Sequence, residues 1–204
     1  MQLLAGKAFT PSNPVRLLLW LMATAMMTLE PVMADMSEKT DPPGVTSDNL
    51  LDREWRLISD QVMGGVSTGR LERDQVLGRD CLCLRGNVST ENNGGFIQMA
   101  ADLRENDIEA RSVYDGIKLW VSGNRHQYNV HLRTTDLWLP WQSYRASFKA
   151  EQDWRQITLP FERFESYKTR RKLNLNHLKR IGLVAIGSDF NAGLCVSDIR
   201  FYRD

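Results

Sequence analysis

The sequence predicts an all-β protein, an antiparallel β-sandwich of the jelly-roll kind, and three observations support this prediction. From Trp55 onward, apolar and polar residues alternate with the period of two that is typical of strands. The alternating runs are short, and turn residues separate them at regular spacing, as in sandwiches and unlike parallel α/β sheets. Segments with the helical period are scarce.

Each predicted strand is bounded by residues that favour turns, mainly glycine, proline, asparagine and aspartate. The span after the leader fits one domain, over residues 53–204, with one core. The predicted strands cover residues 75–88, 95–101, 116–122, 127–134, 142–150, 154–159, 180–187 and 193–202.

Residues 1–34 have the pattern of a signal peptide: a basic start, an uncharged apolar run over 17–29 and a small-residue cleavage site ending at Ala34. The run is shorter than the about 20 residues that a membrane-spanning helix needs, so we expect cleavage and no stable membrane span. We therefore expect an exported protein, periplasmic or secreted. Because no acidic residue precedes Glu30, a mitochondrial presequence is the alternative.

The segment 35–52 is polar and contains Pro42, Pro43 and Gly44, so we expect a flexible lead-in to the domain. The full chain has a net charge of +1, and the segment 1–34 accounts for that charge. The mature chain is then close to neutral, which gives no general attraction to nucleic acid or to acidic membranes. We expect no nucleic-acid partner.

Two glycine pairs indicate sharp turns, because glycine accepts positive φ and the close approach of another backbone. The pairs are Gly64-Gly65 and Gly94-Gly95. Short polar side chains beside each pair can form hydrogen bonds with nearby backbone amides, and the Asn-Gly sequence of the second pair favours a tight hairpin. A calcium site is the alternative, but the motif offers only one carboxylate, so we favour a structural role. The motif residues are Asp60, Met63, Gly64, Gly65, Ser67, Asn92, Asn93, Gly94, Gly95 and Phe96.

Three cysteines, Cys81, Cys83 and Cys195, leave at least one thiol unpaired. Cys81 and Cys83 lie on one face of a predicted strand, and either can bridge to Cys195 only if the last strand is a neighbour. A metal site that uses the thiols is the alternative. Because no histidine stands nearby at ligand spacing, we favour structural or free thiols and expect no metal and no cofactor.

Alternation divides the middle strands into an apolar face, with Ile117, Tyr128 and Tyr144, and a polar face. If these strands are adjacent, the polar face gathers a tryptophan beside planar donors, which suits a sugar or a peptide; a solvated outer face is the alternative. The candidate contact residues are Trp120, Asn129, His131, Arg133, Trp138 and Trp141, with Ser143 and Arg145 beside them.

Ordered motifs extend from Trp55 nearly to the end of the chain: Trp55, 59–67, 86–89, 92–96, 114–117, Tyr128, 132–134, Trp154, 157–161, Phe164 and 181–183. As a set they resemble the complex I intermediate-associated protein 30 kDa family. The resemblance implies a galactose-binding-domain-like β-sandwich, similar to family 11 carbohydrate-binding modules. For mitochondrial relatives it also implies a chaperone role in the assembly of respiratory complex I.

The residues give little support for catalysis. The histidines His126, His131 and His177 have no obvious nucleophile and carboxylate partners, and no phosphate loop or zinc signature is present. We therefore expect a non-enzymatic, exported binding module that binds a protein partner as an assembly factor or chaperone. The alternative is a carbohydrate-binding module that uses the face around Trp120. A glycosidase would require two carboxylates facing one cleft.

Overall fold

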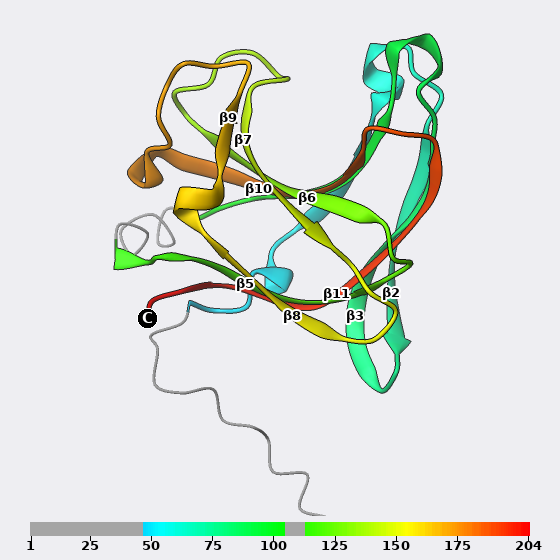
Figure 1. Ribbon diagram of the computed structural model, residues 1–204, viewed down its shortest axis with the longest axis horizontal. Helices are drawn as coiled ribbons and strands as arrows, with labels where there is room; N and C mark the ends of the chain where they lie inside the picture. Colours follow the sequence, from blue (N-terminus) through cyan, green and yellow to red (C-terminus); the bar gives the residue numbers. More distant parts are fainter. Residues whose placement is uncertain (1–46, 105–112) are drawn as a thin grey trace, which may run out of the picture. The chain divides into compact units, whose positions relative to one another are not determined.

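The computed structural model describes residues 47–104 and 113–204, so the predicted signal peptide and most of the lead-in lie outside the described residues. Two antiparallel sheets face each other (Figure 1). One is six-stranded, with the order β1-β4-β10-β6-β7-β9, and the other is five-stranded, with the order β2-β3-β11-β5-β8. The all-β, antiparallel sandwich that the sequence predicts is confirmed.

The six-stranded sheet consists of β1 (Trp55–Ser59), β4 (Phe96–Asp102), β10 (Leu178–Ile186), β6 (Gln127–Thr134), β7 (Ser143–Lys149) and β9 (Glu165–Tyr167). The five-stranded sheet consists of β2 (Thr68–Val76), β3 (Arg79–Val88), β11 (Phe190–Tyr202), β5 (Gly116–Gly123) and β8 (Arg155–Pro160). The helical turns are the short 3₁₀ segments η1 (Leu50–Asp52), η2 (Asp60–Met63), η3 (Glu91–Asn93), η5 (Phe161–Arg163) and η6 (Leu175–His177). No helix in the described ranges is long and apolar enough to cross a membrane.

The core lies between the sheets and is built from the inward residue of each alternating pair. Ile117, Tyr128 and Tyr144, which the sequence assigns to the apolar face, are all fully buried there. Burial of each large apolar side chain contributes about 1.5–3 kcal/mol, so the alternation specifies which face of each strand is inward.

The predicted strand 75–88 is two strands. Leu77 and Gly78 have φ angles of 47° and 77°, and Val76 pairs with Arg79, so a two-residue hairpin joins β2 to β3. Positive φ at both central residues is typical of the hairpin turn whose twist matches that of the strands. Leucine seldom adopts this conformation, which is why the sequence did not reveal the turn. The short strands β1 and β9 were also not predicted.

The run around Asn92 and Gly95 does not form the predicted hairpin. It connects β3 to β4, which belong to different sheets. Asn92 and Asn93 have φ angles of 55° and 58°, and this left-handed stretch turns the chain from one sheet to the other. Asn-Gly therefore marked a turn correctly, but local sequence could not show that the turn crosses between layers.

The end of the expected lead-in packs against the sandwich. Leu50 and Leu51 are buried in the core, and the Ser47 amide donates to the Phe201 carbonyl at 3.0 Å. The Asn49 side chain accepts a hydrogen bond from the amide of Ile199 at 3.1 Å. Residues 47–52 are thus tied to the last strand, β11.

Candidate functional site

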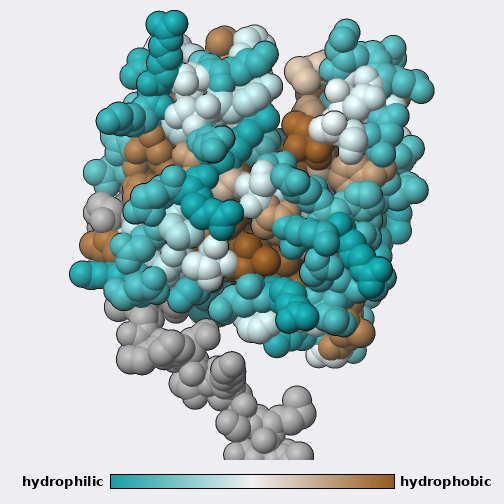
Figure 2. All heavy atoms as spheres, viewed as in Figure 1, coloured by the Kyte–Doolittle hydropathy of each residue, from teal (hydrophilic) through white to brown (hydrophobic). Residues whose placement is uncertain are grey.

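The outer face of the six-stranded sheet is hollowed into a groove of about 720 Å³. One wall carries Val62 and Met63 of η2, whose side chains are 75% and 57% exposed. The opposite wall carries Trp141, from the loop between β6 and β7, and Tyr167 of β9. Figure 2 shows the notch between two lobes at the top of the view, and Figure 1 shows β9 and the loop after β6 on one side and η2 on the other.

Small residues lie on the outer face of the sheet between lining residues of the groove: Ala100 and Gly182 are each two positions from a lining residue, Gln98 and Arg180, on the same strands. Ala100, Gly182 and His131 are register partners on the adjacent strands β4, β10 and β6. Ala100 and Gly182 project almost nothing above the sheet, and a Cβ added at Gly182 would lie 3.3 Å from Oε1 of Gln98. The side chains of Gln98 and His131 line the groove between its two walls.

His131 presents an unpaired polar atom at this floor. Its Nε2 is buried and has no hydrogen-bond partner among the residues that the structure describes. Burial, and secondly the positive charge of Arg145, lowers the pKa of His131 to about 3. The imidazole is therefore neutral at physiological pH, and Nε2 can donate or accept according to the tautomer. Since an unsatisfied buried polar atom costs about 1–3 kcal/mol, a ligand that pairs with it is favoured.

Arg145 brings a positive charge to the wall beside Tyr167. Its guanidinium carbon lies 3.3 Å from the centre of the Tyr167 ring, and its Nε donates to Ser143 Oγ at 2.9 Å. Burial lowers the pKa of Arg145, and contact with Tyr167 partly offsets this effect; an arginine nevertheless stays charged. The ring fixes the guanidinium in place and leaves other N–H groups for an anionic ligand.

Two further arginines, Arg133 and Arg180, make the groove cationic. Arg133 donates to the Pro140 carbonyl, and Arg180 Nε pairs with Asp102 Oδ1 at 2.6 Å. Burial, and then the charge of Arg180, lowers the pKa of Arg133. No aspartate or glutamate is among the described residues that line the groove, and no carboxylate of the described ranges pairs with Arg133 or Arg145. The groove therefore attracts negative charge.

The carboxylate of Asp60 holds the wall formed by η2. It is fully buried and accepts hydrogen bonds from the amides of Ser67 (3.0 Å), Gly95 (2.6 Å) and Phe96 (3.2 Å). A Cβ at Gly65 would collide with this carboxyl group. Burial alone would raise the pKa of Asp60, but the hydrogen bonds outweigh burial and the net shift is downward. A charged side chain therefore ties together two loops that both line the groove.

The remaining motif residues surround this carboxylate. Gly64 has a φ of 89° and ends η2, and Asn92 and Asn93 form the left-handed part of the neighbouring loop. Gly94 leaves no room for a side chain, because a Cβ there would lie 2.5 Å from Asp60 Oδ2. The glycines thus allow both loops to close over one buried charge.

The structure separates the contact residues that the sequence placed on one face. His131, Arg133 and Trp141 line the groove. Trp120 does not, because its strand β5 pairs with β8 and β11 in the other sheet. The prediction that Trp120 shares a face with His131 was therefore wrong. Trp120 instead lies under the guanidinium of Arg79, whose central carbon is 4.3 Å from the ring centroid.

Two other candidates lie near the groove but not in its lining. Trp138 is 85% exposed in the loop after β6. Asn129 is on the correct face of β6, where its side-chain oxygen accepts a hydrogen bond from Ser147 Oγ at 2.6 Å. Ser143 and Arg145 do line the groove, as neighbours of His131 and Arg133.

Several lining residues were not among the sequence candidates. Gln98 and Arg180 come from β4 and β10, which lie between β1 and β6 in the sheet. Alternation within each strand predicts that both side chains face outward. It does not predict that they lie next to His131, because that depends on the order of the strands in the sheet. Val62 lies in the turn that the first glycine pair predicted, but it was not proposed as a contact residue, and Tyr167 lies in β9, which was not predicted.

The sequence of this chain matches the family of complex I intermediate-associated protein 30 over residues 45–195. The chain belongs to this family. No curated protein matches it at a significant level.

Among solved structures, the fold is similar to those of carbohydrate-binding modules. A family 11 module from Clostridium thermocellum, in complex with a β-1,3-1,4-mixed-linked tetrasaccharide, has a TM-score of 0.62 at 13% identity, over 78% of this chain and 94% of that chain. A family 30 module has a TM-score of 0.51 at 13% identity, over 69% and 92%. An exo-β-agarase has a TM-score of 0.51 at 8% identity and is matched over 23% of its own length. At these identities the likeness shows the fold alone.

Proposed function

We propose that this member of the family is a non-enzymatic binding module whose groove holds an extended, acidic segment of a partner protein. The observation that carries the proposal is the combination of apolar walls with two arginines, Arg133 and Arg145, that lack a carboxylate partner in the described part of the chain. Desolvated arginine to carboxylate pairs are charge-assisted and directional, so they can fix the register of a bound peptide.

The walls supply the apolar part of such an interface. Val62, Met63 and Trp141 are exposed although they are large and apolar, and they face one groove from both sides. Aromatic residues, methionine and arginine are the residue types that are enriched in protein interfaces. An assembly factor needs a surface of this kind to hold a partner before the partner joins its complex.

We also propose that the chain is exported, and that it acts in the periplasm or outside the cell. The N-terminal pattern of residues 1–34 supports export, and so does the disulfide between Cys83 and Cys195, because disulfides persist in oxidising compartments. Fractionation of the native host with sequencing of the mature N-terminus tests this. A cytoplasmic chain that still begins at Met1 would contradict export.

A carbohydrate is the second candidate ligand, and the rings of Trp141 and Tyr167 on one wall favour it. Sugars bind by stacking on such rings, and neutral sugars depend little on salt. An acidic peptide depends on the charge of Arg145, so its affinity falls as salt screens that charge. The two candidate ligands should therefore differ in how their affinity responds to salt and to substitution of Arg145 or Trp141.

The experiment recovers envelope proteins on the immobilised mature chain and then measures the affinity of the purified partner for variants. We expect Arg145→Gln to weaken binding about tenfold or more, since the loss of a buried charged pair costs at least 2 kcal/mol. Trp141→Ala should also weaken binding, whereas its matched control Trp138→Ala, in the same loop but outside the groove, should not.

Mixed-linked β-glucan oligosaccharides are titrated against the same variants at low and high salt. Glucan binding that is lost in Trp141→Ala, kept in Arg145→Gln and unaffected by salt would support the carbohydrate candidate. A partner that binds both groove variants as tightly as the wild type would contradict any role for the groove.

A further inference from the structure

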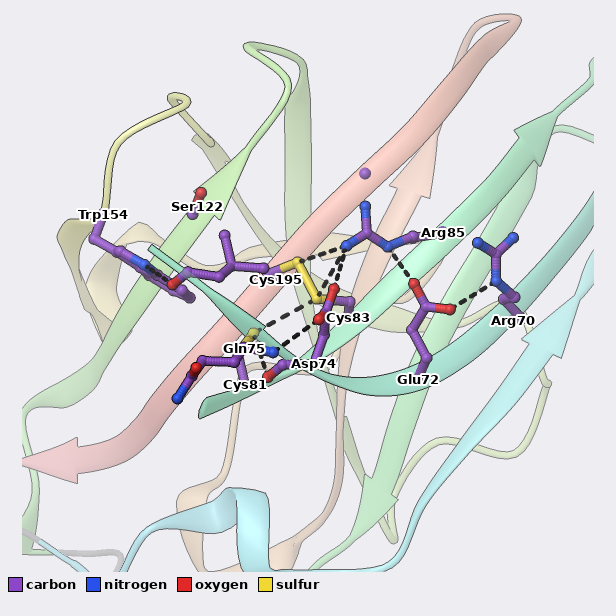
Figure 3. Close-up of a disulfide and its surroundings, with 12 residues drawn as sticks. Arg70, Glu72, Asp74, Gln75, Cys81, Cys83, Arg85, Ser122, Trp154 and Cys195 are labelled. Atoms are coloured by element: carbon purple, nitrogen blue, oxygen red, sulfur yellow. Dashed lines mark hydrogen bonds and ion pairs between the residues drawn. A yellow bond between two sulfur atoms is a disulfide. The ribbon is translucent and has the colours of Figure 1, made fainter. Parts of the chain in front are cut away.

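The outer face of the five-stranded sheet carries a cluster of three sulfur atoms that the proposed function does not use (Figure 3). Cys83 on β3 and Cys195 on β11 are register partners and form a disulfide. Cys81, two residues before Cys83 on the same face, is a free thiol whose Sγ lies 3.6 Å from Cys83 Sγ. All three residues are buried, and the three sulfur atoms lie within 4.8 Å of one another.

A second cavity, of about 660 Å³, reaches this cluster at Cys81. Its lining includes three carboxylate residues, Asp52, Asp74 and Asp80, against one basic residue, Arg73. An acidic cavity raises the local concentration of cations. The cavity therefore offers a cation a route to a buried group of soft sulfur ligands.

The surroundings of the cluster keep it compact. Val76 and Trp154 pack against the cysteines, and the Trp154 indole N–H donates to the Val76 carbonyl at 2.8 Å. Arg85, which pairs with Asp74 at 2.8 Å, places a guanidinium nitrogen 3.9 Å from the sulfur atoms of both Cys83 and Cys195. This positive charge stabilises thiolates that form when the disulfide is reduced.

We propose that the reduced chain binds one thiophilic metal ion, Zn²⁺, through the sulfur atoms of Cys81, Cys83 and Cys195. Zinc to sulfur bonds are about 2.3 Å long, so the sulfur atoms around a tetrahedral ion lie about 3.8 Å apart. The separation of 3.6 Å between the sulfur atoms of Cys81 and Cys83 is close to that value. The cavity at Cys81 leaves the fourth position open to water.

The disulfide controls this site because it occupies two of the three ligands. A dithiol reductant transfers two electrons and two protons to the Cys83–Cys195 bond, and the reductant itself becomes a disulfide. The three thiols then release their protons as the ion binds. A disulfide oxidant reverses this step by thiol–disulfide exchange: it accepts the two electrons, becomes a dithiol, re-forms the Cys83–Cys195 bond and so releases the ion. Metal binding therefore depends on the redox state of the chain.

The test titrates the mature chain with Co²⁺, a spectroscopic substitute for Zn²⁺, with and without prior reduction by a phosphine. We expect the reduced chain to bind one equivalent with a thiolate-to-cobalt charge-transfer band, which Zn²⁺ then displaces. The oxidised chain should show no band. Far-ultraviolet circular dichroism and a thiol count establish that the reduced chain is folded and carries all its thiols.

The variant Cys81→Ser keeps the disulfide pair and therefore the fold. After reduction it should bind the ion about tenfold or more weakly, since even the loss of an outer-sphere partner costs 10–100-fold in metal affinity. The control His177→Ala removes an exposed potential ligand far from the cluster and should bind like the wild type.

Three results would overturn the proposal: a folded, fully reduced chain without the band; a band that persists unchanged in Cys81→Ser; or a chain that unfolds on reduction whether or not metal is present.

Discussion

The outer faces of the two sheets differ although both sheets contribute to one core. On the six-stranded sheet, Ala100 and Gly182 are register partners, and a groove with exposed walls lies on the same face. On the five-stranded sheet, Cys83 and Cys195 are opposite each other, and a covalent bond joins the strands. The residues that are register partners therefore determine the properties of each outer face: on one sheet the partners are small and stay separate, and on the other they are cysteines that form a disulfide.

The two faces also differ in their use of charge. Arg85 on the five-stranded sheet is paired with Glu72 and Asp74. Arg145 in the groove has an aromatic ring and a hydroxyl as its neighbours, and no carboxylate of the described residues. Paired charge stabilises an existing structure modestly, whereas charge without a carboxylate partner is available to a ligand.

The largest expected effect concerns Asp60, which supports the groove wall. Asp60→Ala should lower the free energy of unfolding by about 3–5 kcal/mol, because it removes a buried charge that accepts bonds from three amides. Urea unfolding measures this change. The exposed Asp153→Ala is the control and should stay within about 0.5 kcal/mol. If Asp60→Ala kept both stability and ligand affinity, the wall would not depend on this carboxylate.

The disulfide tests the other face. Replacing both Cys83 and Cys195 by alanine should cost about 2–5 kcal/mol, because the bridge closes a long loop in the unfolded chain. Ligand affinity at the groove should be unchanged at temperatures where the variant is folded. Cys81→Ser, which keeps the bridge, is the matched control. A double variant that loses ligand binding while folded would show that the two faces are coupled.

The protonation of His131 should make stability depend on pH. The pKa of His131 in the folded protein is lowered to about 3, so below about pH 6.5 the unfolded chain binds a proton that the folded chain does not. Stability should therefore fall as the pH decreases from about 6.5 towards 3, by up to about 1.4 kcal/mol per pH unit. In His131→Gln this slope should disappear, which denaturant midpoints at pH 7.5 and pH 5 would show.

The protonation of Asp60 should affect stability in a different, more acidic pH range. Its folded pKa is lowered, so its stabilisation is present above the unfolded value of about 3.9 and is lost as the pH falls through the folded pKa. Glu72 and Glu151 also have lowered pKa values, so the loss of stability that remains in His131→Gln should begin only below about pH 5. An equal slope between pH 7.5 and pH 5 in His131→Gln and the wild type would mean that another group titrates there.

Properties that depend on a single strand could be predicted from the sequence, whereas properties that depend on contacts between distant segments could not. The inward positions of Tyr128 and Tyr144 follow from alternation within one strand, and they were predicted correctly. The placement of Trp120 beside His131 required the pairing order of strands, which long-range contacts decide. The hairpin at Leu77 was missed because a non-glycine residue in the left-handed region carries little sequence signal.

The smallest expected effect concerns Trp120. Trp120→Ala should destabilise the protein by about 1 kcal/mol, through loss of the contact with Arg79 and partial loss of packing. Ligand affinity should be unchanged, because Trp120 lies on the face opposite the groove, whereas Trp141→Ala should weaken binding with little effect on stability. Urea unfolding and ligand titration of both variants measure the two properties. If Trp120→Ala weakened binding as much as Trp141→Ala, the ligand would contact the five-stranded sheet, and the assignment of recognition to the groove would be wrong.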